Sequence, residues 1–177
     1  PVREVRPTPV EEARWGVAMI EDVMWNAIPR FMRELDAILE KYTGEKLPAY
    51  SAPIRFASWM GGDRDGNPNV TAEVTKRVLT INRWSAAQLY YNEVNKVIQE
   101  VSSTDCNEEL RAIVGDVTEP YRVFLRPFRK RLLETQRWAE AQLNGENYKP
   151  ALPLIEDVNE LKDAFALCHQ SICDCYG

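Results

Sequence analysis

Three long segments of this 177-residue sequence space their apolar residues three or four positions apart. This spacing gathers the apolar side chains on one face of an α-helix, whereas a strand would alternate them. In the first segment, Thr8 to Tyr42, the apolar positions are Ala13, Val17, Ile20, Met24, Ile28, Phe31, Leu35, Ile38 and Tyr42. The sequence therefore predicts an all-α fold of long helices.

Local signals give approximate bounds for the helices, which we expect at 9–42, 72–102, 107–114, 119–144 and 158–176. Thr8 and Glu11 form a T-x-x-E capping box before the first helix, and Gly44 follows its end. Pro29 should kink this helix near Trp25 and Asn26. About 34 residues give roughly 50 Å of helix, which suggests a strut within a larger body.

Length and charge narrow the class of protein. A chain of 177 residues favours one domain. The net charge of −5 argues against nucleic acid or an anionic membrane surface as the main partner. The sequence shows no transmembrane stretch and no signal peptide, so we expect a cytoplasmic protein.

Three of the four cysteines lie close to the single histidine, His169. The spacing of Cys168, His169, Cys173 and Cys175 matches no common zinc pattern. We therefore expect small apolar helix residues in a reducing compartment, and no metal site.

The stretch 43–71 is the one long segment without helical periodicity, and it is rich in glycine and proline. Ile54, Phe56, Trp59 and Met60 could anchor it, and the alternation from Ile54 to Ser58 could form one short strand. Long loops of this kind are usually functional or disordered. The apolar anchors favour an ordered, functional loop.

The candidate site lies in this loop, in the run F-A-S-W-M-G-G-D-R-D-G-N-P-N-V-T from Phe56 to Thr71. Glycines allow close backbone approach, Arg64 offers a planar donor fork for an anion, and Trp59 with Met60 offers an apolar wall. The candidate pocket residues are Trp59, Met60, Gly61, Gly62, Asp63, Arg64, Asp65 and Asn67.

The same run invites three other interpretations. In a calcium loop that begins at Asp63, Val74 would stand where a bidentate glutamate is needed. A phosphate-binding loop would need G-K-[S/T], which is absent. A purely structural turn, in which aspartate and arginine pair and asparagine and glycine build turns, remains open.

The same run closely resembles a hallmark segment of phosphoenolpyruvate carboxylase, F-x-S-W-M-G-G-D-R-D-G-N-P-x-V-T, at every fixed position. The flanks resemble the family too. They are R-P-T-P-V-E-E-A-R-W-G from Arg6, Glu34 with Leu35, G-E-K-L-P from Gly44, and E-P-Y-R from Glu119. The resemblance covers essentially the whole chain, and these flanking segments fit bacterial members of the family.

This resemblance implies an internal piece of a larger enzyme, which is largely helical, built around a barrel and tetrameric. That enzyme converts phosphoenolpyruvate and bicarbonate, with Mg²⁺, to oxaloacetate and phosphate. It implies that Trp59 belongs to the apolar pocket for bicarbonate or carbon dioxide. Arg64 would support that site, oriented by Asp63 and Asp65.

The family's T-A-H-P-T-E histidine segment, its G-R-G-G loop and its metal-binding acids have no counterpart here. No complete catalytic set is therefore expected, the 177 residues alone should be inactive, and they should bind no Mg²⁺. The alternative is a non-catalytic helical interaction or regulatory module that keeps the run as a structural loop. The basic run from Arg122 to Arg131 is interpreted as a solvated face or a contact with other parts of the enzyme, not as a nucleic-acid site.

Overall fold

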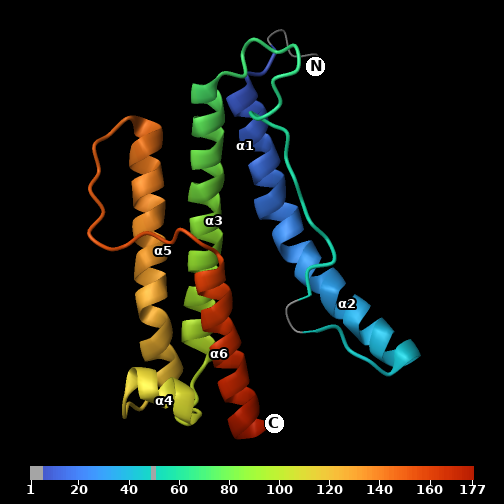
Figure 1. Cartoon of the computed structure of the whole chain (residues 1–177), viewed down its shortest axis with the longest axis vertical. Coiled ribbons are helices and arrows are strands. Elements are labelled where there is room, and N and C mark those ends of the chain that lie inside the picture. The colour runs from blue at the N-terminus through green and yellow to red at the C-terminus, as the bar shows by residue number, and fades with distance from the viewer. Residues whose placement is uncertain (1–5, 49–50) are drawn as a thin grey trace. The chain divides into compact units, whose positions relative to one another are not determined.

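The computed structural model describes residues 6–48 and 51–177, and this part of the chain is helical, without a strand (Figure 1). The all-α prediction is confirmed. Two helices exceed 20 residues, with 29 residues in α3 (Ala72–Glu100) and 25 in α5 (Pro120–Asn144). The chain has two compact units, Pro1–Asn82 and Arg83–Gly177. Helix α3 contributes residues to both units.

The first unit begins with α1 (Pro9–Met19), a π-helical turn η1 (Ile20–Met24) and α2 (Trp25–Thr43). The predicted capping box is present, since the Glu11 N–H donates to Thr8 Oγ1 at 3.3 Å and the Thr8 N–H donates to Glu11 Oε2 at 2.7 Å. Two otherwise unpaired backbone donors are thereby satisfied, which is why the helix starts at Pro9.

The helix is irregular just before the position predicted for the kink at Pro29. The sequence placed a kink at Trp25 and Asn26, whereas the structure has a π turn over Ile20–Met24, closed by the Trp25 N–H donating to the Ile20 carbonyl. Proline has no N–H for the carbonyl four residues before it, and its ring crowds that carbonyl. The carbonyl concerned is that of Trp25, the residue that directly follows the π turn.

The apolar stripe on α1, η1 and α2 is only partly covered. Ala13 is the one buried residue that these three elements have. The other stripe residues are either half-buried, as Val17, Met24, Ile28 and Leu35 are, or exposed, as Ile20, Phe31, Ile38 and Tyr42 are. The periodicity thus correctly predicted that this segment is helical and which of its residues share one face. Few other segments in the described part of the chain cover that apolar face.

The loop between α2 and α3 contains no strand within its described residues, so the suggested strand from Ile54 to Ser58 is wrong. Ile54 and Phe56 are 39% and 56% exposed, so they do not anchor the loop in this structure. An isolated alternating stretch has no neighbouring strand to pair with, and its backbone groups are instead left to solvent.

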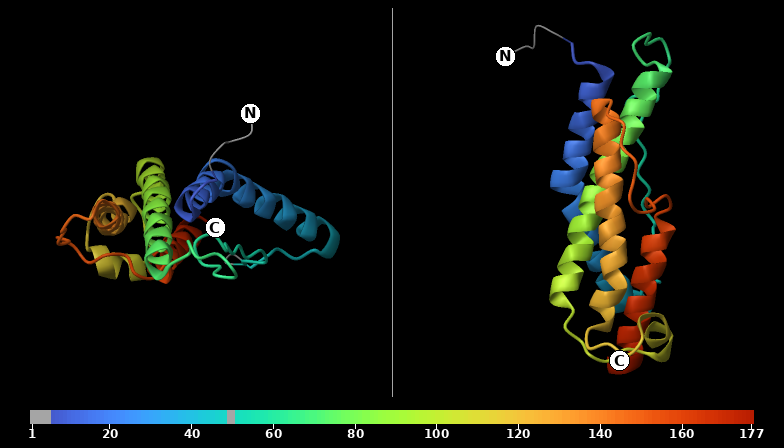
Figure 2. Two further views of the ribbon diagram at one scale, coloured as in Figure 1. Left: turned by 90° about the horizontal axis from the view of Figure 1, so that it is seen from above. Right: turned by 90° about the vertical axis from the view of Figure 1, so that its left-hand side faces the viewer.

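The second unit packs α4 (Glu108–Val114), α5 and α6 (Asn159–Tyr176) with the later part of α3 (Figures 1 and 2). Its core consists of Val94, Ile98, Leu110, Tyr121, Leu125, Leu132, Leu161 and Cys168. The Ser171 hydroxyl lies 2.9 Å from the Tyr121 hydroxyl and accepts the Asn107 N–H at 2.9 Å. This buried serine therefore joins the start of α4 to α5 and α6.

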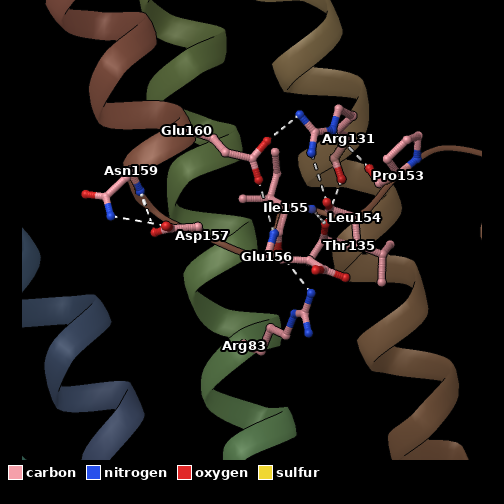
Figure 3. Close-up of polar contacts among 10 residues, drawn as sticks. All are labelled: Arg83, Arg131, Thr135, Pro153, Leu154, Ile155, Glu156, Asp157, Asn159 and Glu160. Carbon is pink, nitrogen blue, oxygen red and sulfur yellow. Dashed lines mark hydrogen bonds and ion pairs between the residues drawn. The ribbon is translucent and has the colours of Figure 1, made fainter.

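A segment after α5, residues 145–158, lies along that helix and is held by polar side chains (Figure 3). Arg131 donates to the Pro153 and Leu154 carbonyls at 3.0 and 2.9 Å and pairs with Glu160 at 2.7 Å. The Ile155 N–H donates to Thr135 Oγ1 at 2.9 Å. These contacts satisfy backbone groups that no helix or sheet satisfies.

The basic run of α5 is therefore only partly a solvated face. Besides Arg131, Arg122 donates to the Val101 carbonyl at 3.1 Å, and Arg129 donates to Asn95 Oδ1 at 3.0 Å. The interpretation as a solvated surface is wrong for these three arginines. Their guanidinium groups reach carbonyls and amides far along the chain, which spacing within one helix does not indicate.

Glu134 makes the stability of the second unit depend on pH. Its Oε1 accepts the Ala151 N–H at 2.6 Å and the Tyr148 hydroxyl at 2.9 Å, and the residue is 5% exposed. The Ala151 N–H above all, helped by the Tyr148 hydroxyl, holds the pKa of Glu134 below its usual value of 4.5. The carboxylate thus stabilises the fold above its unfolded pKa, and this contribution is lost as the pH falls through the folded pKa.

We expect Glu134→Gln to lower the melting temperature at pH 7 and to flatten its fall between about pH 5 and pH 3, because the amide keeps an acceptor oxygen but does not titrate. Thermal unfolding followed by circular dichroism across this range measures both effects. Glu140→Gln, at an exposed position of the same helix, is the matched control. An acid profile that Glu134→Gln leaves as steep as the wild type would contradict the assignment.

Candidate functional site

The candidate residues occupy the last part of the loop that joins α2 to α3, at the start of α3 (Figure 1). The loop makes a tight turn at Trp59, whose carbonyl accepts the N–H groups of Gly62 and Asp63, both at 2.9 Å. Thr71 then caps α3, since the Val74 N–H donates to Thr71 Oγ1 at 3.3 Å. The helix accordingly begins at Ala72.

Gly61 is the buried centre of this turn. Its φ is +70°, a conformation that side-chain-bearing residues rarely adopt. A Cβ at this position would lie 2.5 Å from Val78 Cγ2 on α3. Glycine is therefore required here both by the backbone conformation and by the close approach to the helix.

Met60 and Trp59 have different environments, although the sequence grouped them as one apolar wall. Met60 is half-buried and lies against α1, where its Cε would be 2.0 Å from a Cβ on Gly16. Trp59 is 76% exposed. Met60 therefore fixes the turn to α1, while the indole of Trp59 offers a free aromatic surface.

The polar residues of the loop mostly build turns. Asp63 Oδ1 accepts the Asp65 N–H at 3.0 Å, and Asn67 Oδ1 accepts the Asn69 N–H at 3.0 Å. These are side-chain-closed turns of the kind that aspartate and asparagine favour. The two residues thus shape the loop on either side of Gly66.

Arg64 has a different partner from the one expected. Its Nη2 lies 3.4 Å from Thr75 Oγ1 on α3, and the same hydroxyl donates to the Gly61 carbonyl at 2.7 Å. Among the ion pairs of residues 6–48 and 51–177, none joins Arg64 to Asp63 or Asp65. The guanidinium therefore contacts Thr75 rather than either aspartate.

Sequence reasoning missed Thr75 and Gly16, because each acts through a contact with a distant part of the chain. It also missed a groove of about 640 Å³ beside the loop, between the starts of α1 and α3. Arg6, Asn69, Glu73 and Arg77 are among its polar lining residues. The capping box at Thr8 and the glycine-rich run each contribute lining residues, but neither pattern indicates that the two segments meet.

The described residues contain no group of three or more His, Cys, Asp or Glu side chains arranged to hold a metal ion. On α6, Cys173 Sγ lies 3.8 Å from His169 Nε2. Burial raises the pKa of the Cys168 thiol to about 11, so this cysteine is protonated and suits the apolar core in which it lies.

The comparison with known protein families decides the affiliation of the chain. A family model described as phosphoenolpyruvate carboxylase matches residues 1–177. The chain belongs to the phosphoenolpyruvate carboxylase family. The resemblance based on the run from Phe56 to Thr71 is thereby confirmed.

Curated phosphoenolpyruvate carboxylases are close relatives. The chain is 51% identical over 177 residues to that of a Marinomonas species and 51% identical over 174 residues to that of Pseudomonas syringae pv. tomato. It is 48% identical over 174 residues to that of Pseudomonas aeruginosa. Each match covers 98% of this chain and 20% of the relative, so the chain spans about one fifth of the length of these phosphoenolpyruvate carboxylases.

Proposed function

We propose that this chain is part of a phosphoenolpyruvate carboxylase, a carbon–carbon lyase that forms oxaloacetate and phosphate from phosphoenolpyruvate and bicarbonate. The observation that carries the proposal is the match of the family model along the whole chain. The relatives at about 50% identity support it by their names. Such an enzyme fixes carbon, because it incorporates bicarbonate into oxaloacetate. The oxaloacetate then feeds the tricarboxylic acid cycle.

Within that enzyme, we assign the loop to the surroundings of the carbon substrate. Trp59 presents an exposed apolar surface next to a turn that Gly61 and Met60 hold against two helices. An apolar wall would exclude water, which would otherwise hydrolyse a carboxyphosphate intermediate or protonate the enolate. Trp59 lies in a turn whose neighbouring residues, Met60 and Gly61, contact α1 and α3. This location supports a role for Trp59 that requires a fixed backbone position.

Arg64 is the charged group that this arrangement could offer to a reacting anion. Its side chain is exposed apart from the contact with Thr75, so part of the guanidinium donor set is available. A preorganised cation next to an apolar surface stabilises negative charge better than one in bulk water. Asp63 and Asn67 then serve to shape the loop.

The remaining features of the proposed enzyme rest on the family resemblance. We assign Mg²⁺ to residues outside the described part of this chain, because no set of ligands is assembled there. The Oδ1 atom of Asp63, which could otherwise bind a cation, accepts a backbone N–H.

We further propose a homotetrameric, allosterically regulated, cytoplasmic enzyme. In the described residues, no helix is both long enough and apolar enough to span a membrane.

The proposal predicts where activity resides. The full-length protein that carries this sequence should form oxaloacetate from phosphoenolpyruvate and bicarbonate with Mg²⁺, whereas the 177 residues alone should remain at background. Coupled reduction of oxaloacetate by malate dehydrogenase measures both. An inactive but folded full-length protein would favour the non-catalytic helical module instead. Turnover by the pure 177-residue chain would show that the chemistry does not reside in the missing parts.

A further inference from the structure

Thr75 is the point at which the loop is fastened to α3. Its Oγ1 lies 2.7 Å from the Gly61 carbonyl, 3.4 Å from Arg64 Nη2 and 3.2 Å from the Thr71 carbonyl. Its own backbone N–H donates to the Thr71 carbonyl at 3.0 Å, so the residue is part of the regular helix. The hydroxyl therefore sits on a rigid element and faces the loop.

The hydroxyl can serve both loop partners at once. It has one hydrogen, which the short distance assigns to the Gly61 carbonyl, and its lone pairs accept from the Arg64 guanidinium. The turn at Gly61 and the side chain of Arg64 are thus held through one oxygen atom. A residue without a hydroxyl would leave the carbonyl and the guanidinium without this link.

We propose that Thr75 is a positioning residue that sets the orientation of Arg64 in the candidate site. The kinetic part of this inference rests on the proposed carboxylase function, while the structural part does not. Thr75 acts through Arg64 and the Gly61 turn, and it has no role in contact with substrate. Valine replaces the hydroxyl with a methyl group of similar size and keeps the β-branch, which allows the hydroxyl to be tested alone.

The chain offers a matched control on the same helix. Thr80 is also half-buried, and its Oγ1 donates to the Lys76 carbonyl at 2.9 Å, a bond within α3. Thr75→Val and Thr80→Val therefore make the same chemical change, but only the first removes a bond to the loop. Thr75→Ser keeps the hydroxyl and should restore most of what Thr75→Val loses.

The first measurement needs no enzymatic activity. Trypsin cleavage after the exposed Arg64, followed by mass spectrometry on the full-length protein, reports how often the loop opens. Thr75→Val should raise the rate of this cleavage about tenfold, because a hydrogen bond of typical strength is lost. Thr75→Ser and Thr80→Val should stay within about twofold of the wild type. Equal cleavage rates in Thr75→Val and Thr80→Val would overturn the structural part.

The second measurement is a double-mutant cycle on the turnover number kcat. Thr75→Val should lower kcat about tenfold in the wild type but threefold or less when Arg64 is already alanine, because its effect passes through Arg64. Equal losses in both backgrounds, or no rescue by Thr75→Ser, would overturn the positioning role. If the wild-type protein forms no oxaloacetate, the proposed function fails, and the trypsin comparison still decides whether Thr75 holds the loop.

Discussion

Replacing Arg64 with alanine in the full-length enzyme is expected to lower kcat about 100-fold, the scale observed when one preorganised charge partner is removed. The guanidinium is exposed toward solvent and contacts Thr75, so its loss removes a positive charge without opening a core. Steady-state kinetics give the effect, and circular dichroism with gel filtration shows that helicity and assembly are retained.

Trp59→Ala provides the contrast within the same experiment. Loss of the exposed indole should raise the KM for bicarbonate and let phosphoenolpyruvate hydrolysis proceed without carboxylation, because water then reaches the reacting groups. Phosphate release measured against oxaloacetate formation detects this uncoupling. If kcat and the bicarbonate KM of both variants matched the wild type, the loop would be a structural turn and the assigned roles would be wrong.

Gly61→Ala should abolish most activity, by about 100-fold or more, because a Cβ 2.5 Å from Val78 Cγ2 must push the turn away from α3. The left-handed backbone adds roughly 1–2 kcal/mol of strain. Gly66→Ala is the matched control: Gly66 has the same φ of +70°, but a Cβ added there would have no atom within 4 Å, so this variant isolates the backbone term.

The comparison of these two glycine variants by kcat and by thermal unfolding separates close approach from backbone conformation. Gly66→Ala should keep most of the activity, and Gly61→Ala combined with Val78→Ala should recover part of what Gly61→Ala loses. Similar losses in the two single variants would mean that the contact with Val78 has no influence on the site.

The helices could be predicted from sequence because their signals are local. The capping box at Thr8 and the cap at Thr71 lie within four residues of the backbone groups that they satisfy. The structure has α3 at Ala72–Glu100, against the predicted 72–102. The glycine-rich turn was also visible, since only certain residues adopt its conformation.

The contacts that give these elements their role could not be predicted in the same way. Arg131 binds carbonyls more than 20 residues away, and Thr75 reaches back to Gly61 across 14 positions. Helical spacing says which face is apolar but not whether another segment covers it, as the exposed Phe31 and Ile38 demonstrate. Such partners are set by tertiary packing, which one sequence does not encode in local patterns.

The two supports of the loop differ in how much chain each must close. Gly61 meets α3 across 14 positions, whereas Met60 meets Gly16 of α1 across 44. Residues 17–43 of the longer span are helical, so the contact with α1 depends on the direction of those helices, whereas the chain from Gly61 to the start of α3 is a short loop that leads directly into the helix it contacts. The turn is therefore seated on α3 more readily than on α1. If the contact with α1 is lost, the turn stays on α3. If the contact with α3 is lost, only the contact between Met60 and Gly16 still holds the turn.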